Sequence, residues 1–392
     1  MSINNITGSP VEGNNFFGRE KELEFALNEL KKGNSLILSA PRRVGKSSFG
    51  KKLLSSLKSE NWNTLEIDLE EIRTEEAFVK LLISKLAEQG WWEKFKAKTS
   101  EVVNSIMESI KVSGEYAGVK GSIEYQKAKA DYYEKLKNLL DHTEETVIMV
   151  DEVTILLNSF ISAEEENGKN NVETFLNWLR SIRQVTGTKI RWVFCSSIGI
   201  ENFTSLHNLS HTFNDVNSFQ IGAFNNTKAK SLIEELAKSE MIEMSDNHID
   251  YMLDKLGWHL PYFIQILFSN INQMIKVDEV VISNDLIDKA YQKLINEKHL
   301  NTWDERLKEY AANEQYARLI LNQLSQIKEG DTRENILNVI YNKVNDADAV
   351  NEITSQLMYM LKNDGYIIDT DDNKYTFRSP LLRDFWFNRF VK

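Results

Sequence analysis

The stretch that decides the fold is LILSAPRRVGKSSFGKKLL, residues 36–54. It passes from an apolar run through a basic turn into a helical pattern. Residues 40–47 match the pattern G-x-x-x-x-G-K-S/T except that Ala40 takes the first position, where a methyl group is tolerated as long as φ stays negative. A chance lysine at a strand-turn-helix junction is the alternative. Because the match follows a predicted buried strand and opens a predicted helix, it predicts a phosphate-binding loop.

Each residue type in this loop suits a nucleotide with Mg²⁺. Backbone N–H groups surround the phosphates, and Gly45 lets the backbone approach them without a Cβ in the way. We expect Lys46 to place its charge between the terminal phosphates, where it also serves catalysis, and Ser47 to bind the metal. Arg42 and Arg43 either contact the nucleotide or pair with a nearby acid. The residues assigned to nucleotide contact are Ala40, Pro41, Arg42, Arg43, Val44, Gly45, Lys46, Ser47 and Ser48.

A second candidate site is the pair of carboxylates that ends the apolar run VIMVDE, residues 147–152. Carboxyl ends of parallel strands meet at one edge of a sheet, so we expect Asp151 beside the loop, where it holds the Mg²⁺ shell. Glu152 is expected to polarise the attacking water. The alternative is that the two acids only end a strand and cap the next helix. Together the loop and the acids predict a site for ATP or ADP with Mg²⁺.

The composition excludes several classes of protein. The chain has 392 residues, of which 42% are hydrophobic, so it is long enough for two or three cores. A net charge of −11 argues against a surface that attracts nucleic acid or anionic lipid everywhere. A single cysteine, Cys195, and six histidines without metal-ligand spacing argue against a disulfide framework or a metal cluster. The sequence shows neither the basic-then-apolar pattern of a secretory signal peptide nor an apolar stretch of membrane-spanning length. We therefore expect a cytoplasmic chain without a membrane partner.

Predicted strands alternate with amphipathic helices in the first part of the chain, which we place at residues 1–222. This order indicates an α/β fold with a mostly parallel sheet and helices on both faces. The span 91–140 is longer than a crossover needs, and residues 110–126 alternate around glycines like a hairpin, so we predict an insertion that is mobile or faces a partner. The predicted strands are 35–39, 64–68, 146–150 and 190–195, and the helices are 46–60, 74–89 and 172–186.

The chain after residue 222 is predicted to be helical, with a lid domain at 223–302 in which Gly257 ends one helix and Pro261 opens the next. In the last segment, 303–392, three helical patterns precede YIIDTDDNKYTFRS, which predicts two short strands around an acidic turn. Three helices and a hairpin predict a winged helix-turn-helix domain.

Several motifs resemble, in order and spacing, the archaeal-type ATPases of the prokaryotic AAA+/STAND-like group. They are Phe17-Gly18-Arg19-Glu20 before a helix, APRRVGKSS, VIMVDEV, WVFCSSIG, GWHLP and the C-terminal YTFRSPLLRDFW. The resemblance covers nearly the whole chain and is specific for the family, but it does not single out one cellular role. It implies an AAA+-like P-loop NTPase domain followed by an all-α lid and a winged helix.

The resemblance also implies contacts with the nucleotide base. Phe17, Gly18 and Arg19 match the segment that lies against the adenine in such proteins. Pro261, with Gly257 before it, matches the glycine–proline element whose proline packs on the base. Backbone preference at the first turn of a helix explains Pro261 equally well.

Two further catalytic positions come from the same resemblance. Ser197, after Ser196, matches the sensor-1 position that touches the γ-phosphate or the attacking water, although both serines equally fit a hydrogen-bonded strand end. Arg180 and Arg183 lie on the helix before the WVFC strand, where a neighbouring subunit could receive an arginine finger, and we assign that role to Arg183. Solvated or acid-paired arginines are the alternative. No arginine occupies the second-sensor region, and His259 is a poor substitute, so tight coupling of hydrolysis to lid motion is not implied.

The predicted wing is acidic. Asp369, Asp371 and Asp372 face only Lys374 at its tip, and carboxylates repel the phosphates that supply most of the affinity for DNA. The usual mode of DNA binding is therefore disfavoured. The alternative is a packing or protein-docking role with the aromatic end, Phe385-Trp386-Phe387, buried.

The favoured function is an ATP-binding, slowly hydrolysing molecular switch that couples nucleotide state to a protein partner. The resemblance suggests signalling in defence or stress response. The alternatives are an ATP-dependent DNA-binding protein resembling the archaeal origin-recognition initiators and a nucleotide-binding scaffold that does not hydrolyse ATP. A nucleotide-dependent homo-oligomer also fits the family.

Overall fold

The computed structural model describes residues 3–41, 43–88, 104–111, 123–141, 144–163, 168–196, 199–344 and 346–392, without the side chains of 123–126, 141, 309 and 311. Within it the contacts form two compact units. The first comprises Met1–Gly18, Pro41–Ser48 and Gly222–Lys392, and the second comprises Arg19–Ala40 and Phe49–Ile221.

The second unit is built on a five-stranded sheet in the order β2-β3-β4-β1-β5, and every pair of neighbours is parallel. Its strands are β1 (Leu36–Ser39), β2 (Asn63–Asp68), β3 (Thr146–Asp151), β4 (Ile190–Cys195) and β5 (Asn217–Gln220). The three interior strands β3, β4 and β1 are almost entirely buried, as expected for strands that helices cover on both faces. The predicted parallel sheet is confirmed, with β5 as an additional edge strand.

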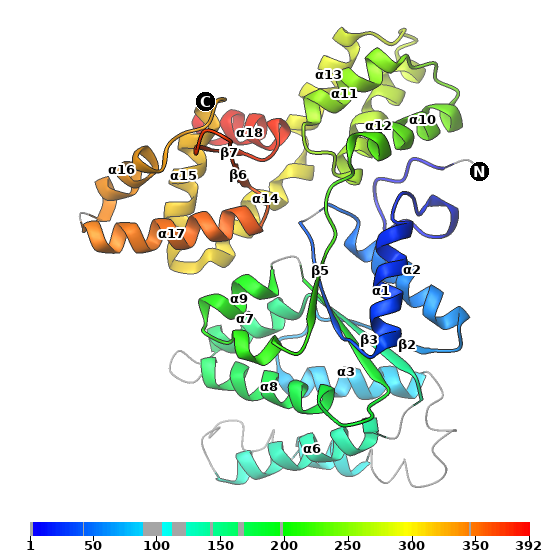
Figure 1. The fold of residues 1–392 in the computed structure, drawn as a ribbon, viewed down its shortest axis with the longest axis vertical. Helices are drawn as coiled ribbons and strands as arrows, with labels where there is room; N and C mark the ends of the chain where they lie inside the picture. Colours follow the sequence, from blue (N-terminus) through cyan, green and yellow to red (C-terminus); the bar gives the residue numbers. More distant parts are fainter. Residues whose placement is uncertain are drawn as a thin grey trace. The chain divides into compact units, whose positions relative to one another are not determined.

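Helices cover both faces of this sheet (Figure 1). On one face lie α1 (Glu20–Lys32) and α2 (Lys46–Ser59), and on the other lie α3 (Glu75–Glu88), α7 (Val153–Ala163), α8 (Gly168–Arg183) and α9 (Ile200–Leu206). Gly50 of α2 shows how closely that helix approaches β3, because a Cβ there would lie 2.6 Å from the Met149 sulfur. Phe219 of β5 stacks on Phe25 of α1 at 5.4 Å between ring centres.

The predicted hairpin at 110–126 is wrong where the structure describes it. Residues 104–111 are helical, α6 (Ile123–Asp141) begins within the predicted hairpin, and residues 112–122 lie outside the described residues. Tyr133 of α6 stacks on Trp178 of α8 at 4.3 Å, and Tyr132 and Leu136 are fully buried. The helical spacing of these apolar residues outweighs the short alternation around the glycines. The described part of the predicted insertion therefore belongs to the core.

The helices of the first unit that follow residue 222 begin with α10 (Asn226–Glu240), α11 (Asp246–Leu256), α12 (Pro261–Val277) and α13 (Asn284–Asn296). The side chains of Asn225 and Ser245 accept backbone N–H hydrogen bonds at the starts of α10 and α11. Pro261 is the first residue of α12, as predicted. Gly257 ends α11 with φ = 63°, and a Cβ there would lie 2.4 Å from Cδ of Pro380. Glycine is therefore required at this position both by backbone conformation and by space.

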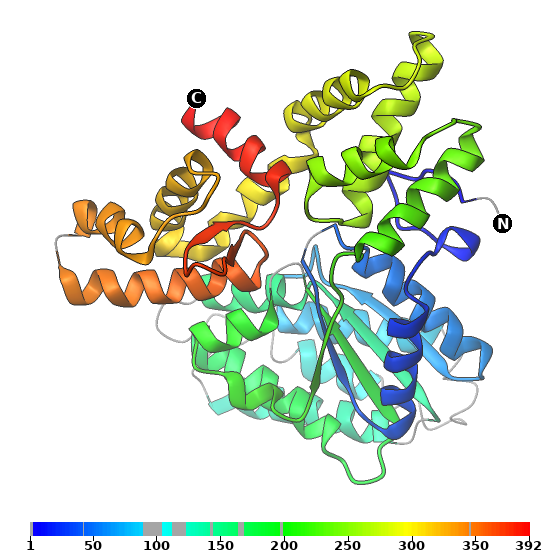
Figure 2. The same ribbon diagram turned by 45° about the horizontal axis from the view of Figure 1, so that its top comes forward.

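The C-terminal part of the first unit contains the three helices and the hairpin expected from the sequence. It comprises α14 (Asn301–Arg306), α15 (Glu314–Gln326), α16 (Arg333–Val344), α17 (Ala347–Asn363), β6 (Ile367–Asp369), β7 (Tyr375–Phe377) and α18 (Pro380–Trp386). The two strands are antiparallel. In Figure 2 the red helix α18 runs beside α15, with which it is in contact. The winged-helix assignment and the boundaries at residues 222 and 302 stay predictions.

Buried polar contacts stabilise this part. The Arg306 guanidinium lies 2.9 Å from the Asp364 carboxylate, the two side chains are each 1% exposed, and the Tyr310 hydroxyl donates to the same carboxylate. Phe385 and Trp386 are buried, whereas Phe387 is 36% exposed. None of the described helices is long and apolar enough to cross a lipid bilayer.

Candidate functional site

The carboxyl edge of the sheet carries the first part of the candidate site. Leu38 of β1 pairs with Cys195 of β4, and Val150 of β3 pairs with Phe194 of β4. Asp151, the next residue of β3, is therefore level with Leu38. With about 4.8 Å between neighbouring strands and β4 between them, the two Cα atoms lie roughly 10 Å apart. The carboxylate of β3 thus lies at the edge from which the predicted phosphate loop departs.

The backbone at this edge has an uncommon conformation. Glu152 has φ = 56°, in the left-handed region that non-glycine residues rarely adopt. Its N–H donates to Oδ1 of Asp151 at 3.0 Å, and its carbonyl accepts from the N–H of Ile155 in the first turn of α7. Such conformations cost about 1 kcal/mol or more and gather at functional sites. The roles of Asp151 and Glu152 in metal binding and hydrolysis stay predictions.

Two polar residues beside these acids were missed by the sequence analysis as site residues. Asp68 ends β2 directly opposite Asp151, so a second carboxylate lies at the same edge. Thr154 of α7 shares a hydrogen bond with Ser196, which is 4% exposed at the end of β4. Asp68 was accessible to sequence reasoning, because TLEID ends in an acid just as VIMVDE does. Ser197, the predicted sensor, lies outside the described residues.

The predicted phosphate loop joins β1 to α2, which begins at Lys46. Gly45 has φ = 93°, where a side chain would be strained, so the backbone conformation favours glycine here. The predicted close approach of its backbone to phosphates stays a prediction. Val44 is 2% exposed and anchors the loop. The Ser48 hydroxyl accepts the N–H of Val11 at 2.9 Å, so it holds the N-terminal segment. Arg42 lies outside the described residues.

Arg43 stacks on an aromatic ring, and its predicted contact with the nucleotide stays a prediction. Its guanidinium carbon lies 4.3 Å from the centre of the Tyr262 ring, and its backbone has φ = 68°. Among the described residues its contact is with this ring, and no acid pairs with it. The Tyr262 hydroxyl in turn shares a 2.8 Å hydrogen bond with Nδ1 of His299.

The segment predicted to lie against adenine, residues 17–19, packs against the ring of Phe224. Phe17 meets Phe224 edge to face with 6.2 Å between ring centres. Gly18 has φ = 72°, and a Cβ there would lie 3.2 Å from the Phe224 ring, so the backbone passes close to it. Arg19 is 5% exposed and pairs with Glu22 at 3.2 Å; burial lowers the pKa of its guanidinium against the opposing effect of Glu22. Contact of these residues with a base stays a prediction.

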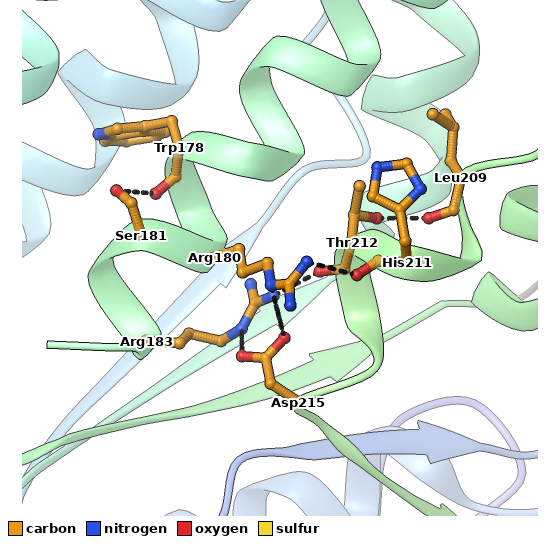
Figure 3. A network of polar contacts seen from close by, with 8 residues as sticks. All are labelled: Trp178, Arg180, Ser181, Arg183, Leu209, His211, Thr212 and Asp215. Carbon is orange, nitrogen blue, oxygen red and sulfur yellow. Dashed lines mark hydrogen bonds and ion pairs between the residues drawn. The ribbon is translucent and has the colours of Figure 1, made fainter.

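The arginine-finger assignment is wrong for Arg183 (Figure 3). Its side chain is 2% exposed, and Nε and Nη2 donate to the two carboxylate oxygens of Asp215 at 2.9 and 3.0 Å. Nη2 also donates to the carbonyl of Thr212 at 2.6 Å. A finger has to reach a neighbouring subunit, whereas this guanidinium is enclosed and bidentate. Arg180 is 27% exposed and donates to the carbonyl of His211 at 2.8 Å. The acid-paired alternative describes Arg183 correctly.

The predicted metal ligands are oxygen donors, which are of the kind that Mg²⁺ binds. No group of three or more His, Cys, Asp or Glu side chains that could enclose a metal occurs in the part of the chain that the structure describes. Mg²⁺ is usually held by one or two carboxylates together with phosphate oxygens and waters. Asp151 and the Ser47 hydroxyl are donors of that kind.

Comparison with solved structures shows the fold. A Walker-type ATPase of Pyrococcus abyssi is similar with a TM-score of 0.60 and 15% identity, over 97% of this chain and 99% of that one. The ORC2 protein of Aeropyrum pernix, solved in ADPNP and ADP complexes, is similar with a TM-score of 0.54 and 12% identity, over 96% of each chain. No protein-family model and no curated protein matches the sequence. The chain has the α/β fold of P-loop NTPases.

Proposed function

We propose that this protein binds ATP and ADP with Mg²⁺ and hydrolyses ATP slowly, as a molecular switch of the AAA+/STAND type. The observation that carries the proposal is the register of the sheet. It puts Asp151 level with the last residues of β1, from which the sequence APRRVGKS follows directly. Chemically different groups that suit one ligand thus occur at the same edge of one sheet, at the ends of two strands with β4 between them.

The roles of the residues follow from their chemistry. Lys46, the first residue of α2, supplies a cation for the terminal phosphates, and Ser47 and Asp151 supply oxygen ligands for the metal. Glu152, held in a strained conformation beside Asp151, orients the attacking water. We assign the sensor role to Ser197 and base contacts to Phe17, Gly18, Arg19 and Pro261.

The composition of the first unit supports a switch. It contains residues 41–48 of the loop together with all helices after residue 222. Three contacts connect the loop, the N-terminal segment and α12. Val11 of the N-terminal segment bonds to Ser48, Ile6 of the same segment bonds to Gln265 of α12, and Arg43 of the loop stacks on Tyr262 of α12. A change in loop conformation on triphosphate binding would therefore alter these contacts with the helices. A ligand that favours one arrangement of the contacts shifts the conformational equilibrium toward it. A protein partner in signalling, defence or stress response would respond to that shift.

An ATP-dependent DNA-binding function is the second candidate, which the resemblance of the sequence motifs to the archaeal origin-recognition initiators suggests. The hairpin opposes it. Lys374 pairs with Asp372 at 2.6 Å and Lys362 pairs with Asp369 at 3.0 Å, so the cations nearest the turn are already neutralised by carboxylates. A steep fall in duplex-DNA affinity with salt that requires ATP would favour this second function over the first.

The experiment that tests the proposed function is a titration of the full chain with ATP and Mg²⁺. The wild type should bind, and Lys46→Ala should lose binding because the loop then has no phosphate cation. Ser59→Ala, at the far end of the same helix, is the matched control and should bind as the wild type does. Equal affinity in Lys46→Ala and the wild type refutes the assignment.

A further inference from the structure

The contact between Arg43 and Tyr262 is not required by the chemistry of phosphate binding. Arg43 belongs to the loop, and Tyr262 is the second residue of α12, directly after Pro261. With 4.3 Å from the guanidinium carbon to the ring centre, the cation is well within the range of about 6 Å over which it is attracted to the negative face of an aromatic ring.

The position of Tyr262 is fixed by a second contact. Its hydroxyl is bonded to Nδ1 of His299, which lies in the short turn Lys298–Leu300 after α13. Burial raises the pKa of Tyr262, and this outweighs the lowering by nearby Arg43, so the phenol is neutral at physiological pH. The ring therefore offers Arg43 a fixed, uncharged face.

The direction of this contact is informative. Residues 223–302 contain no arginine, so the helices there cannot send a guanidinium toward the phosphates. Here the guanidinium belongs to the loop and reaches a helix instead. A second contact also joins the loop to residues far along the chain. A Cβ built on Gly365 would lie 3.4 Å from Cβ of Pro41, and the Trp258 ring packs at the same place. The loop residues Pro41 and Arg43 are thus both held by residues far along the chain.

We propose that Arg43 is a positioning residue, which stacks on Tyr262 and thereby keeps the phosphate loop in its binding conformation, so that nucleotide affinity depends on the position of α12. This inference rests on the proposed function and deepens it. A loop that is in its binding conformation only part of the time has an apparent affinity reduced by that fraction. Loss of the stack lowers affinity even though every phosphate ligand remains present.

A double-mutant cycle on nucleotide affinity tests the inference, with a fluorescent ATP analogue and Mg²⁺ as the probe and the full chain as the protein. Arg43→Ala and Tyr262→Leu should each weaken binding about tenfold, the effect of losing one cation–π contact between two partly buried side chains. Because both changes remove the same contact, the double variant should bind the analogue about as weakly as either single variant does. Tyr262→Phe keeps the ring and should bind within about twofold of the wild type.

The outcomes separate the possible failures. If Arg43→Ala weakens binding while Tyr262→Leu does not, or if the two effects multiply to about a hundredfold, Arg43 acts on the phosphates directly and the inference is overturned. If Tyr262→Phe is as weak as Tyr262→Leu, the bond to His299 matters and the ring face does not, which also overturns it. If the wild type does not bind the analogue, the proposed function itself fails.

Discussion

Replacement of Arg183 by alanine should destabilise the protein strongly, because Asp215 then loses its bidentate partner. Arg183 is 2% exposed and Asp215 is 18% exposed, and two hydrogen bonds of 2.9 and 3.0 Å join them. Removal of one partner from a buried pair costs about 3–5 kcal/mol, and the partial exposure of Asp215 favours the lower end of that range. At about 2–4 °C for each kcal/mol, a loss of about 3 kcal/mol lowers the melting temperature by roughly 6–12 °C.

Arg180→Ala is the matched control on the same helix. Arg180 is 27% exposed, lies 3.9 Å from Asp215 and makes one hydrogen bond to a carbonyl, so its loss should cost less than about 1 kcal/mol. The assay is urea denaturation followed by intrinsic tryptophan fluorescence, together with ATP hydrolysis at a temperature where all variants are folded. If Arg183→Ala unfolds at the same urea concentration as the wild type but loses hydrolysis, Arg183 acts as a finger and its pairing with Asp215 does not stabilise the fold.

Two further predictions concern the contact between α11 and α18 and the proposed catalytic base, Glu152. Gly257→Ala should lower the melting temperature measured by calorimetry, because φ = 63° and the 2.4 Å approach to Pro380 leave no room for a methyl group; an unchanged melting temperature would show that the α11–α18 contact is loose. Glu152→Gln should bind ATP like the wild type and stop hydrolysis, since the amide cannot activate water. An unchanged hydrolysis rate rules Glu152 out as the base. Size measurement of Glu152→Gln with and without ATP then distinguishes an oligomer from an intramolecular switch.

Most of the fold could be predicted because its elements carry strong local patterns. The central strands are continuous apolar runs, and α10 to α13 have the apolar spacing and caps typical of helices. The edge strand β5 was not predicted, because NSFQ is short and exposes three of its four residues. It is a strand because of its pairing with β1, which the local sequence does not encode.

The candidate site was predictable only where it is continuous in the chain. The loop and the acids at the end of β3 each lie within one short motif, so residue type and spacing were sufficient to propose them as site residues. Arg183 was misassigned because its partner Asp215 follows the next strand, and pairs of this kind depend on tertiary packing. The stack of Arg43 on Tyr262 was missed for the same reason. The partners and roles of single charged residues outside a motif could therefore not be predicted from sequence.

The central claim is that one site holds a triphosphate and its Mg²⁺ through Lys46 and Asp151. The most direct test is calorimetric titration with ATP, with and without Mg²⁺, of the wild type and Asp151→Asn. We expect Mg²⁺ to strengthen ATP binding to the wild type and Asp151→Asn to lose most of this gain. An equal gain from Mg²⁺ in both proteins would contradict the claim.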